Sequence, residues 1–158
     1  MSQAKTLTAQ ELRRVTDYVA TRQHAARNRA MLLITHLAGM RVGEVAALRI
    51  CDVVDADGKV RNEIRLQAEQ TKGNFARVVF VSEKLQKELA QYLALYTPTN
   101  RDCKLFYTQK RMREGFTANT LAQHFHHLYR NAGLAGCSSH TVVDDNYLGR
   151  LTTTMLAG

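Results

Sequence analysis

The chain of 158 residues has the length of one ordinary domain, and its 45% hydrophobic and 23% charged residues are typical of a globular protein. No window approaches the run of about 18 apolar residues that a membrane helix needs, and the N-terminal residues lack the apolar core of a secretory signal. We therefore expect a cytoplasmic protein with no membrane partner. Lys and Arg outnumber Asp and Glu by 22 to 14, and the resulting net charge of +8 favours a polyanionic partner such as nucleic acid.

A capping box and an apolar stripe predict the first helix. In Thr8-Ala9-Gln10-Glu11 the hydroxyl and the carboxylate can satisfy backbone N–H groups at the start of a helix that runs through about Ala20. Its buried stripe consists of Leu12, Val15 and Val19. A second helix is predicted over residues 25–37, with Met31, Ile34 and Leu37 buried. Three arginines are placed near its start and on its exposed face, namely Arg22, Arg27 and Arg29.

Gly39 is predicted to end the second helix in the left-handed conformation. After a turn at Arg41, a short third helix should direct Val45 and Leu48 inward. The pattern then alternates, and residues 63–66 and 77–81 predict two antiparallel strands joined by the turn Thr71-Lys72-Gly73-Asn74. This part of the chain therefore predicts a small sheet.

Two more helices are predicted in the second half. Ser82 can cap a fourth helix that ends at Pro98, with an apolar face made of Leu85, Leu89, Leu93, Tyr92 and Tyr96. A fifth helix should run from about Thr117 or Asn119 to Ala132 and end at Gly133, with Leu121, Phe125 and Leu128 buried. The predicted fold class is α+β, mainly helical with one small antiparallel β-sheet. Residues 141–158 show no clear periodicity, and no structure is assigned to them.

The cysteines and histidines offer little support for a metal site. Cys51, Cys103 and Cys137 are far apart, odd in number and without a Cys-x-x-Cys pair, so we expect buried free thiols. His124 and His127 have the i, i+3 spacing of metal ligands on a helix, but no cysteine or carboxylate at a fitting spacing accompanies them. A polar helix face is the favoured interpretation, and we expect no metal.

The segment from Ala38 to Glu44 is typical of an anion site. Arg41 lies between two glycines at a turn between helices, where N–H groups of the next helix point outward. A guanidinium can bind two phosphate oxygens at once, and Glu44, one helical turn later, can hold it in place. The alternative from these two residues alone is a surface Arg-Glu pair on an ordinary helical hairpin.

The wider pattern resembles the tyrosine recombinases, the phage integrase family. The first conserved box of that family reads close to G-x-R-x-G-E-x-x-x-L, and the matching residues are Gly39, Arg41, Gly43, Glu44 and Leu48. The family's L-x-x-x-D-[IV] also resembles the stretch from Leu48 to Val53. Further similarities follow in the family's order: a helix that begins L-T-x-x-E, a hairpin turn with Thr-Lys-Gly, and a Ser-Ser-His before the second box. Coverage extends from about Thr6 to His140.

The resemblance implies a role for each of four residues in DNA strand cleavage and rejoining. Arg41 would bind the scissile phosphate and stabilise the transition state, and Glu44 would orient Arg41. Lys72 would protonate the departing 5′-hydroxyl as general acid, and His140 would be a further phosphate ligand and proton-transfer group. The resemblance also implies that this reaction uses a 3′-phosphotyrosyl intermediate and no metal or nucleotide cofactor. From the residues alone, Lys72 could be a solvated turn lysine and His140 a structural histidine.

After His140 the sequence departs from the family pattern. The second box is H-x-x-R, but Val143 stands where its arginine belongs, and Tyr147 follows His140 by only seven residues, too few to match the nucleophile. Restoring one base inside the codon of Thr141 permits the reading Ser-Gly-Arg-Arg, which completes the box. We therefore hypothesise that residues 141–158 are a frameshifted tail.

The expected organisation is a partial tyrosine recombinase catalytic domain over residues 1–140, an atypical tail over residues 141–158, and no N-terminal core-binding domain. The expected function is that of a DNA-binding recombinase or integrase-family domain that no longer cleaves double-stranded DNA. The alternatives are a non-catalytic DNA-binding regulator and an inactive remnant of a mobile element. Members of the family act as tetramers, so the resemblance implies a homo-oligomer on DNA, but without the docking tail we expect a monomer.

Overall fold

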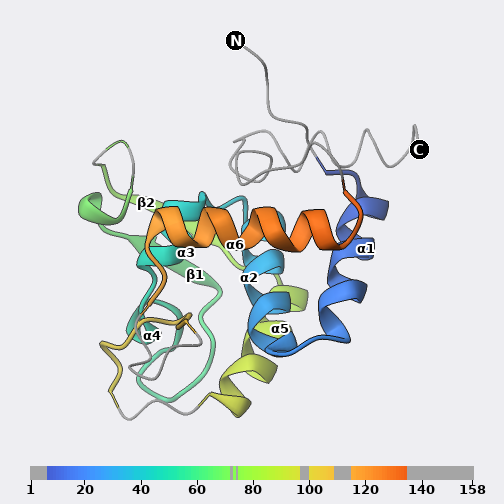
Figure 1. Ribbon diagram of the computed structural model, residues 1–158. Helices are drawn as coiled ribbons and strands as arrows, with labels where there is room; N and C mark the ends of the chain where they lie inside the picture. Colours follow the sequence, from blue (N-terminus) through green and yellow to red (C-terminus); the bar gives the residue numbers. More distant parts are fainter. Residues whose placement is uncertain (1–6, 72, 74, 97–99, 109–114, 135–158) are drawn as a thin grey trace.

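In a computed structural model of the chain, the described residues are 7–71, 73, 75–96, 100–108 and 115–134. They form the following elements in chain order: α1 (Ala9–Ala20), α2 (Ala25–Ala38), α3 (Val42–Ala47), α4 (Ile50–Val53), β1 (Glu63–Leu66), the 3-10 turn η1 (Ala68–Gln70), β2 (Arg77–Phe80), α5 (Glu83–Leu95) and α6 (Ala118–Asn131). The predicted mainly helical α+β class is confirmed (Figure 1). None of the helices in the described ranges combines the length and the apolar character needed to cross a membrane.

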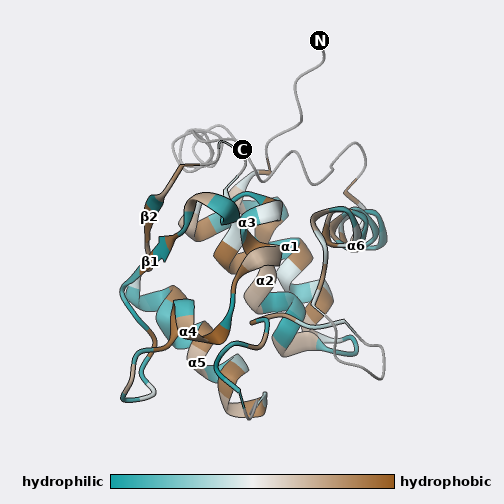
Figure 2. Ribbon diagram, turned by 90° about the vertical axis from the view of Figure 1, so that its left-hand side faces the viewer, coloured by the Kyte–Doolittle hydropathy of each residue, from teal (hydrophilic) through white to brown (hydrophobic). Residues whose placement is uncertain are grey.

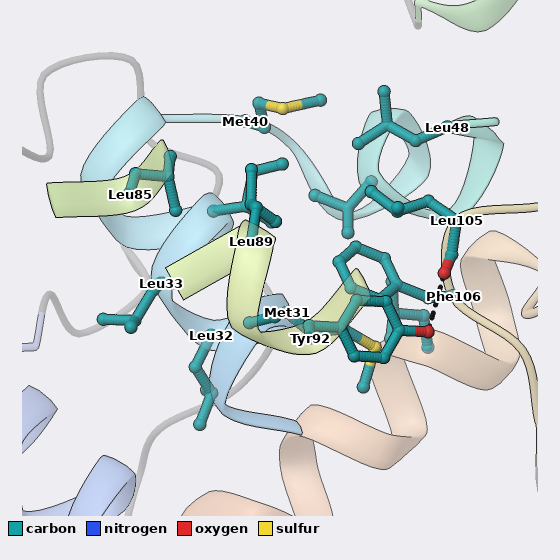
Figure 3. Close-up of a cluster of buried hydrophobic side chains, with 14 of the residues drawn as sticks. Met31, Leu32, Leu33, Met40, Leu48, Leu85, Leu89, Tyr92, Leu105 and Phe106 are labelled. Carbon is teal, nitrogen blue, oxygen red and sulfur yellow. Dashed lines mark hydrogen bonds between the residues drawn. The ribbon is translucent and has the colours of Figure 1, made fainter. Parts of the chain in front are cut away.

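Helix α2 lies at the centre and packs against α1, α3 and α5. Every residue from Ala30 to His36 is buried, as expected for a helix covered on several sides. The Thr35 hydroxyl is satisfied within the helix, because it donates to the carbonyl of Met31 at 2.6 Å. Figure 3 shows the main cluster around this helix, in which Met31 and Leu32 lie near side chains of α5 such as Leu89.

The segment over residues 100–108 is anchored to the core by Leu105 and Phe106, which are both buried. The phenol of Tyr92 donates to the carbonyl of Leu105 at 2.7 Å, the dashed line in Figure 3. Phe106 is 1% exposed, and its ring centroid lies 5.3 Å from that of Tyr92. The N–H of Leu105 donates to the carbonyl of Leu48 at 2.9 Å, so the same segment supports the chain between α3 and α4.

Strands β1 and β2 form an antiparallel pair at the edge of the molecule in both views (Figures 1 and 2). The register pairs Glu63 with Phe80 and Leu66 with Arg77. Ile64 and Val79 face the core, whereas Phe80 on the opposite face is 73% exposed. The predicted alternation of buried and exposed positions is therefore confirmed.

Three details differ from the sequence expectation. The predicted third helix stops at Ala47, and α4 begins after Arg49, because the Asp52 carboxylate accepts the Arg49 N–H at 2.9 Å and caps a new helix. Helix α5 ends at Leu95 rather than at Pro98, which lies outside the described residues. Cys51 and Cys103 are half-buried free thiols rather than buried ones, and Cys137 is outside the described residues.

Candidate functional site

Arg41 lies in the turn between α2 and α3. Gly39 ends α2 with a φ of 68°, the predicted left-handed cap, which glycine adopts without a Cβ penalty. Arg41 is the N-cap of α3, and its carbonyl accepts the N–H of Val45 at 2.9 Å. Met40 and Leu48, both fully buried, anchor the turn and the end of α3 in the core (Figure 3). Arg41 is thus half-buried in a turn that the core fixes on both sides.

Glu44 holds this turn through the main chain. Its Oε1 accepts the backbone N–H of Arg41 at 2.9 Å, which caps the first turn of α3. The Glu44 side chain is only 3% exposed, so the alternative of a surface Arg-Glu pair is wrong. A buried carboxylate needs a cationic or hydrogen-bonding partner. Here the second partner is Arg77, and the predicted orienting of the Arg41 guanidinium by Glu44 stays a prediction.

Arg77 was not among the residues expected at the site. Its Nη2 donates to Glu44 Oε1 at 2.8 Å and to the carbonyl of Gly39 at 3.3 Å. The contact joins residues that are 33 positions apart, so no helical or turn spacing indicates it. One local signal does exist. Arg77 shares a strand face with the buried Val79, and an arginine on the inward face of a strand predicts a buried acidic partner.

The turn predicted to carry Lys72 is described only in part, because Lys72 itself lies outside the described residues. The base of this turn is closed by Thr71, whose Oγ1 donates to the carbonyl of Phe75 at 2.7 Å and accepts the Phe75 N–H at 3.1 Å. Gln70 ties the same turn to the α3–α4 region, because its Nε2 donates to Asp52 Oδ2 at 3.0 Å and to the carbonyl of Ala47 at 3.3 Å. The base of the hairpin turn is therefore anchored beside α3.

His140, Val143 and Tyr147 also lie outside the described residues. Of the four expected site residues, the structure therefore describes Arg41 and Glu44, and it brings these two into contact. The roles expected for Lys72 and His140 stay predictions.

Arg27 corrects one expectation, because it is 3% exposed rather than on the open face of α2. Its Nη2 and Nε donate to Asn28 Oδ1 at 2.9 and 3.2 Å, and its Nη1 donates to the carbonyl of Tyr107 at 3.1 Å. The guanidinium also lies 5.3 Å from the centroid of the Phe116 ring. Tyr107 and Phe116 belong to segments remote in sequence that cover Arg27, and helical periodicity does not reveal these contacts. Burial lowers the pKa of Arg27.

Two histidines are held neutral by their surroundings. His124 is hydrogen-bonded through Nε2 to Asn28 Oδ1 at 2.8 Å, and burial, with a smaller effect of Arg27, lowers its pKa to about 4. His36 is fully buried, with Nε2 3.3 Å from the Tyr129 hydroxyl, and burial lowers its pKa to about 3. Both histidines link α2 to α6.

His124 and His127, which have the spacing of metal ligands in the sequence, lie in different environments. His124 is half-buried on Asn28, whereas His127 is exposed. Among the described side chains, no group of three or more His, Cys, Asp or Glu could hold a metal ion.

The chain belongs to the phage integrase family, whose model matches residues 5–142. Transposase A from transposon Tn554 of Staphylococcus aureus is 27% identical over 94 residues, which cover 58% of this chain and 25% of that protein. The chain thus corresponds to about a quarter of the length of this relative.

Solved structures of recombinases share the fold. XerA recombinase has a TM-score of 0.71 at 23% identity, with 99% of this chain and 51% of that chain covered. The catalytic core of lambda integrase has a TM-score of 0.65 at 16% identity, with 96% of this chain and 85% of that chain covered. Lambda integrase bound to DNA has a TM-score of 0.67 at 16% identity, with 99% and 53% covered. The chain therefore spans about half of XerA and most of the lambda integrase catalytic core.

Proposed function

We propose that this chain binds double-stranded DNA as an integrase-family domain, with Arg41 on a backbone phosphate. The observation that carries the proposal is the support of the Arg41 main chain, whose N–H is bonded to the buried carboxylate of Glu44. Glu44 thus fixes the main chain from which the Arg41 side chain extends, and the planar fork of a guanidinium matches two phosphate oxygens. The net charge of +8 and the DNA complexes solved for lambda integrase support DNA as the partner.

The proposed site is completed by Lys72 and His140, which the resemblance assigns to proton transfer at the cleaved bond. Support for Lys72 comes from the base of its turn, which Gln70 attaches to Asp52 next to α3. A lysine on this turn would approach the phosphate that Arg41 binds.

Replacement of Arg41 by alanine is expected to weaken duplex binding about tenfold at low salt, since one charge-assisted contact is lost. The slope of log K against log salt should flatten by about 0.9, the value of one phosphate contact. Fluorescence anisotropy of a labelled duplex over a salt series measures both. Arg22→Ala is the matched control, because Arg22 is an exposed arginine that follows α1 and its replacement removes the same charge. Equal effects of the two substitutions would remove Arg41 from the interface.

We also propose that the chain does not cleave the DNA that it binds. Val143 occupies the position of the second phosphate-binding arginine, and the family match ends at residue 142, next to the codon where the proposed frameshift begins. Without this arginine the charge of the transition state is only partly neutralised. Residues 141–158 would then be a frameshifted tail on a partial catalytic domain, and the protein would act as a DNA-binding regulator or be an inactive remnant.

A nicked suicide-substrate library is expected to trap no covalent adduct with this chain, as judged by denaturing electrophoresis. The matched control is the chain with one base restored at the codon of Thr141 and read on in the shifted frame, which should form the adduct. Sequencing the locus tests the same idea, because an integrase-like sequence must continue in that frame. An adduct on the unaltered chain that disappears with Tyr147→Phe would overturn the proposal.

A further inference from the structure

Arg77 bridges the two ends of the Arg41 turn. It is the first residue of β2, and one nitrogen, Nη2, donates to the carbonyl of Gly39 at 3.3 Å and to Glu44 Oε1 at 2.8 Å. Gly39 ends α2, and Glu44 in turn accepts the N–H of Arg41. The three-residue turn from Gly39 to Arg41 is thus held at both ends by a single guanidinium.

The ion pair between Arg77 and Glu44 is largely shielded from water. The Glu44 side chain is 3% exposed and that of Arg77 is 28% exposed, so water screens the pair less than it screens a surface pair. A buried carboxylate that loses its cation is strongly disfavoured, and it would regain a partner only by moving. Such a movement would carry with it the N–H of Arg41, which Glu44 accepts.

Arg77 also belongs to the hairpin whose turn contains Lys72. In the chain it follows Lys72 by five positions, and in the sheet it is paired with Leu66 of β1. The turn between the strands is closed at its base by the hydrogen bonds between Thr71 and Phe75. A contact from Arg77 to the Arg41 turn is therefore a direct link between the hairpin and the phosphate-binding turn.

We infer that Arg77 is a positioning residue, which holds the main chain of the Arg41 turn in place through Gly39 and Glu44. The inference rests on the proposed function, because it assumes that Arg41 binds the phosphate. Arg77 acts through Glu44 and the main chain of Gly39 and does not itself touch the DNA. Lysine is a poor substitute, because its ammonium is a point charge on a flexible stem.

The first test follows the Arg41 amide by NMR-detected hydrogen exchange, which needs no DNA. In Arg77→Gln the exchange of this amide should accelerate about tenfold, because local opening of the turn becomes easier. The amide of Leu12 in α1, bonded to Thr8, should be unchanged. In Arg77→Lys the exchange rate of the Arg41 amide should lie between the rates in the original chain and in Arg77→Gln. This variant provides the test if Arg77→Gln unfolds. Arg65→Gln, an exposed arginine of β1, is the matched control for the lost charge.

The second test is a double-mutant cycle for duplex affinity. Arg77→Gln should weaken binding about threefold to tenfold in the original chain and have no effect in the Arg41→Ala background, since the effect passes through Arg41. Equal weakening in both backgrounds would show a direct contact of Arg77 with DNA and overturn the inference. An unchanged exchange rate of the Arg41 amide would overturn it as well. If Arg41→Ala alone leaves affinity unchanged, the proposed function fails, and the exchange rate still decides whether Arg77 holds the turn.

Discussion

Lowering the pH from 7 to 4 is expected to reduce the free energy of unfolding by about 3 kcal/mol for each of two histidines, His36 and His124. Burial lowers the pKa of His36 to about 3 and that of His124 to about 4, whereas a histidine in the unfolded chain titrates near 6.5. Below pH 6.5 the unfolded chain therefore binds protons that the folded chain does not. The stabilisation from the neutral rings is complete above pH 6.5 and is lost as the pH falls toward 4 and 3.

Urea unfolding at pH 7, 6, 5 and 4 measures this dependence. His124→Asn should flatten the curve by about 1.4 kcal/mol per pH unit between pH 6.5 and 4.5, the value of one proton. His126, exposed on the same helix, provides the matched control, and His126→Asn should leave the curve unchanged. If the two variants gave the same pH dependence, the acid sensitivity would have to come from groups other than His124.

Glu44→Ala is expected to lower the free energy of unfolding by about 2–3 kcal/mol and to weaken duplex binding as much as Arg41→Ala does. The substitution leaves the N–H of Arg41 without its acceptor and the guanidinium of Arg77 without its carboxylate. Removal of one partner from a fully buried ion pair costs more than this, but the Arg77 side chain is 28% exposed and water can replace part of the lost interaction. Urea unfolding and anisotropy titration measure the two effects.

Glu88→Ala is the matched control for Glu44→Ala. Glu88 forms a bidentate pair with Arg29 at 3.0 and 3.1 Å between α5 and α2. Side-chain exposure of 34% for Arg29 and 16% for Glu88 makes this pair more accessible to water, so its loss should cost about 1 kcal/mol or less. DNA affinity should stay unchanged. Equal losses of stability in the two variants would mean that burial does not strengthen the interactions of Glu44.

Much of the helical framework and the proximity of Arg41 and Glu44 could be predicted from the sequence. The capping box of Thr8 and Glu11, the left-handed Gly39 and the N-cap Ser82 are confirmed, because each depends on hydrogen bonds or backbone angles within a few residues. The contact of Arg41 with Glu44 is local in the same way, since the two residues are three positions apart on one helical turn. Lys72 and His140 stay predictions.

Two arginines, Arg27 and Arg77, have partners that are remote in sequence. Arg27 was expected on an exposed face, yet it is covered by Phe116 and bonded to Tyr107, 80 positions away in the chain. The sequence pattern predicts only that Arg77 belongs to a strand, whereas in the structure it holds the Arg41 turn through Glu44. In both cases the guanidinium is partnered by residues that helical or strand periodicity cannot bring together.

The sequence by itself determined the family, the helices, the hairpin and the position of Arg41 between its glycines, because these depend on short-range patterns of polarity, capping and motif spacing. Only the tertiary structure decided that Glu44 is buried, that it binds the main chain of Arg41, and that Arg77 is its cation. The physical reason is that the environment of a charge is set by whatever chain segments fold over it, and those segments are remote in sequence.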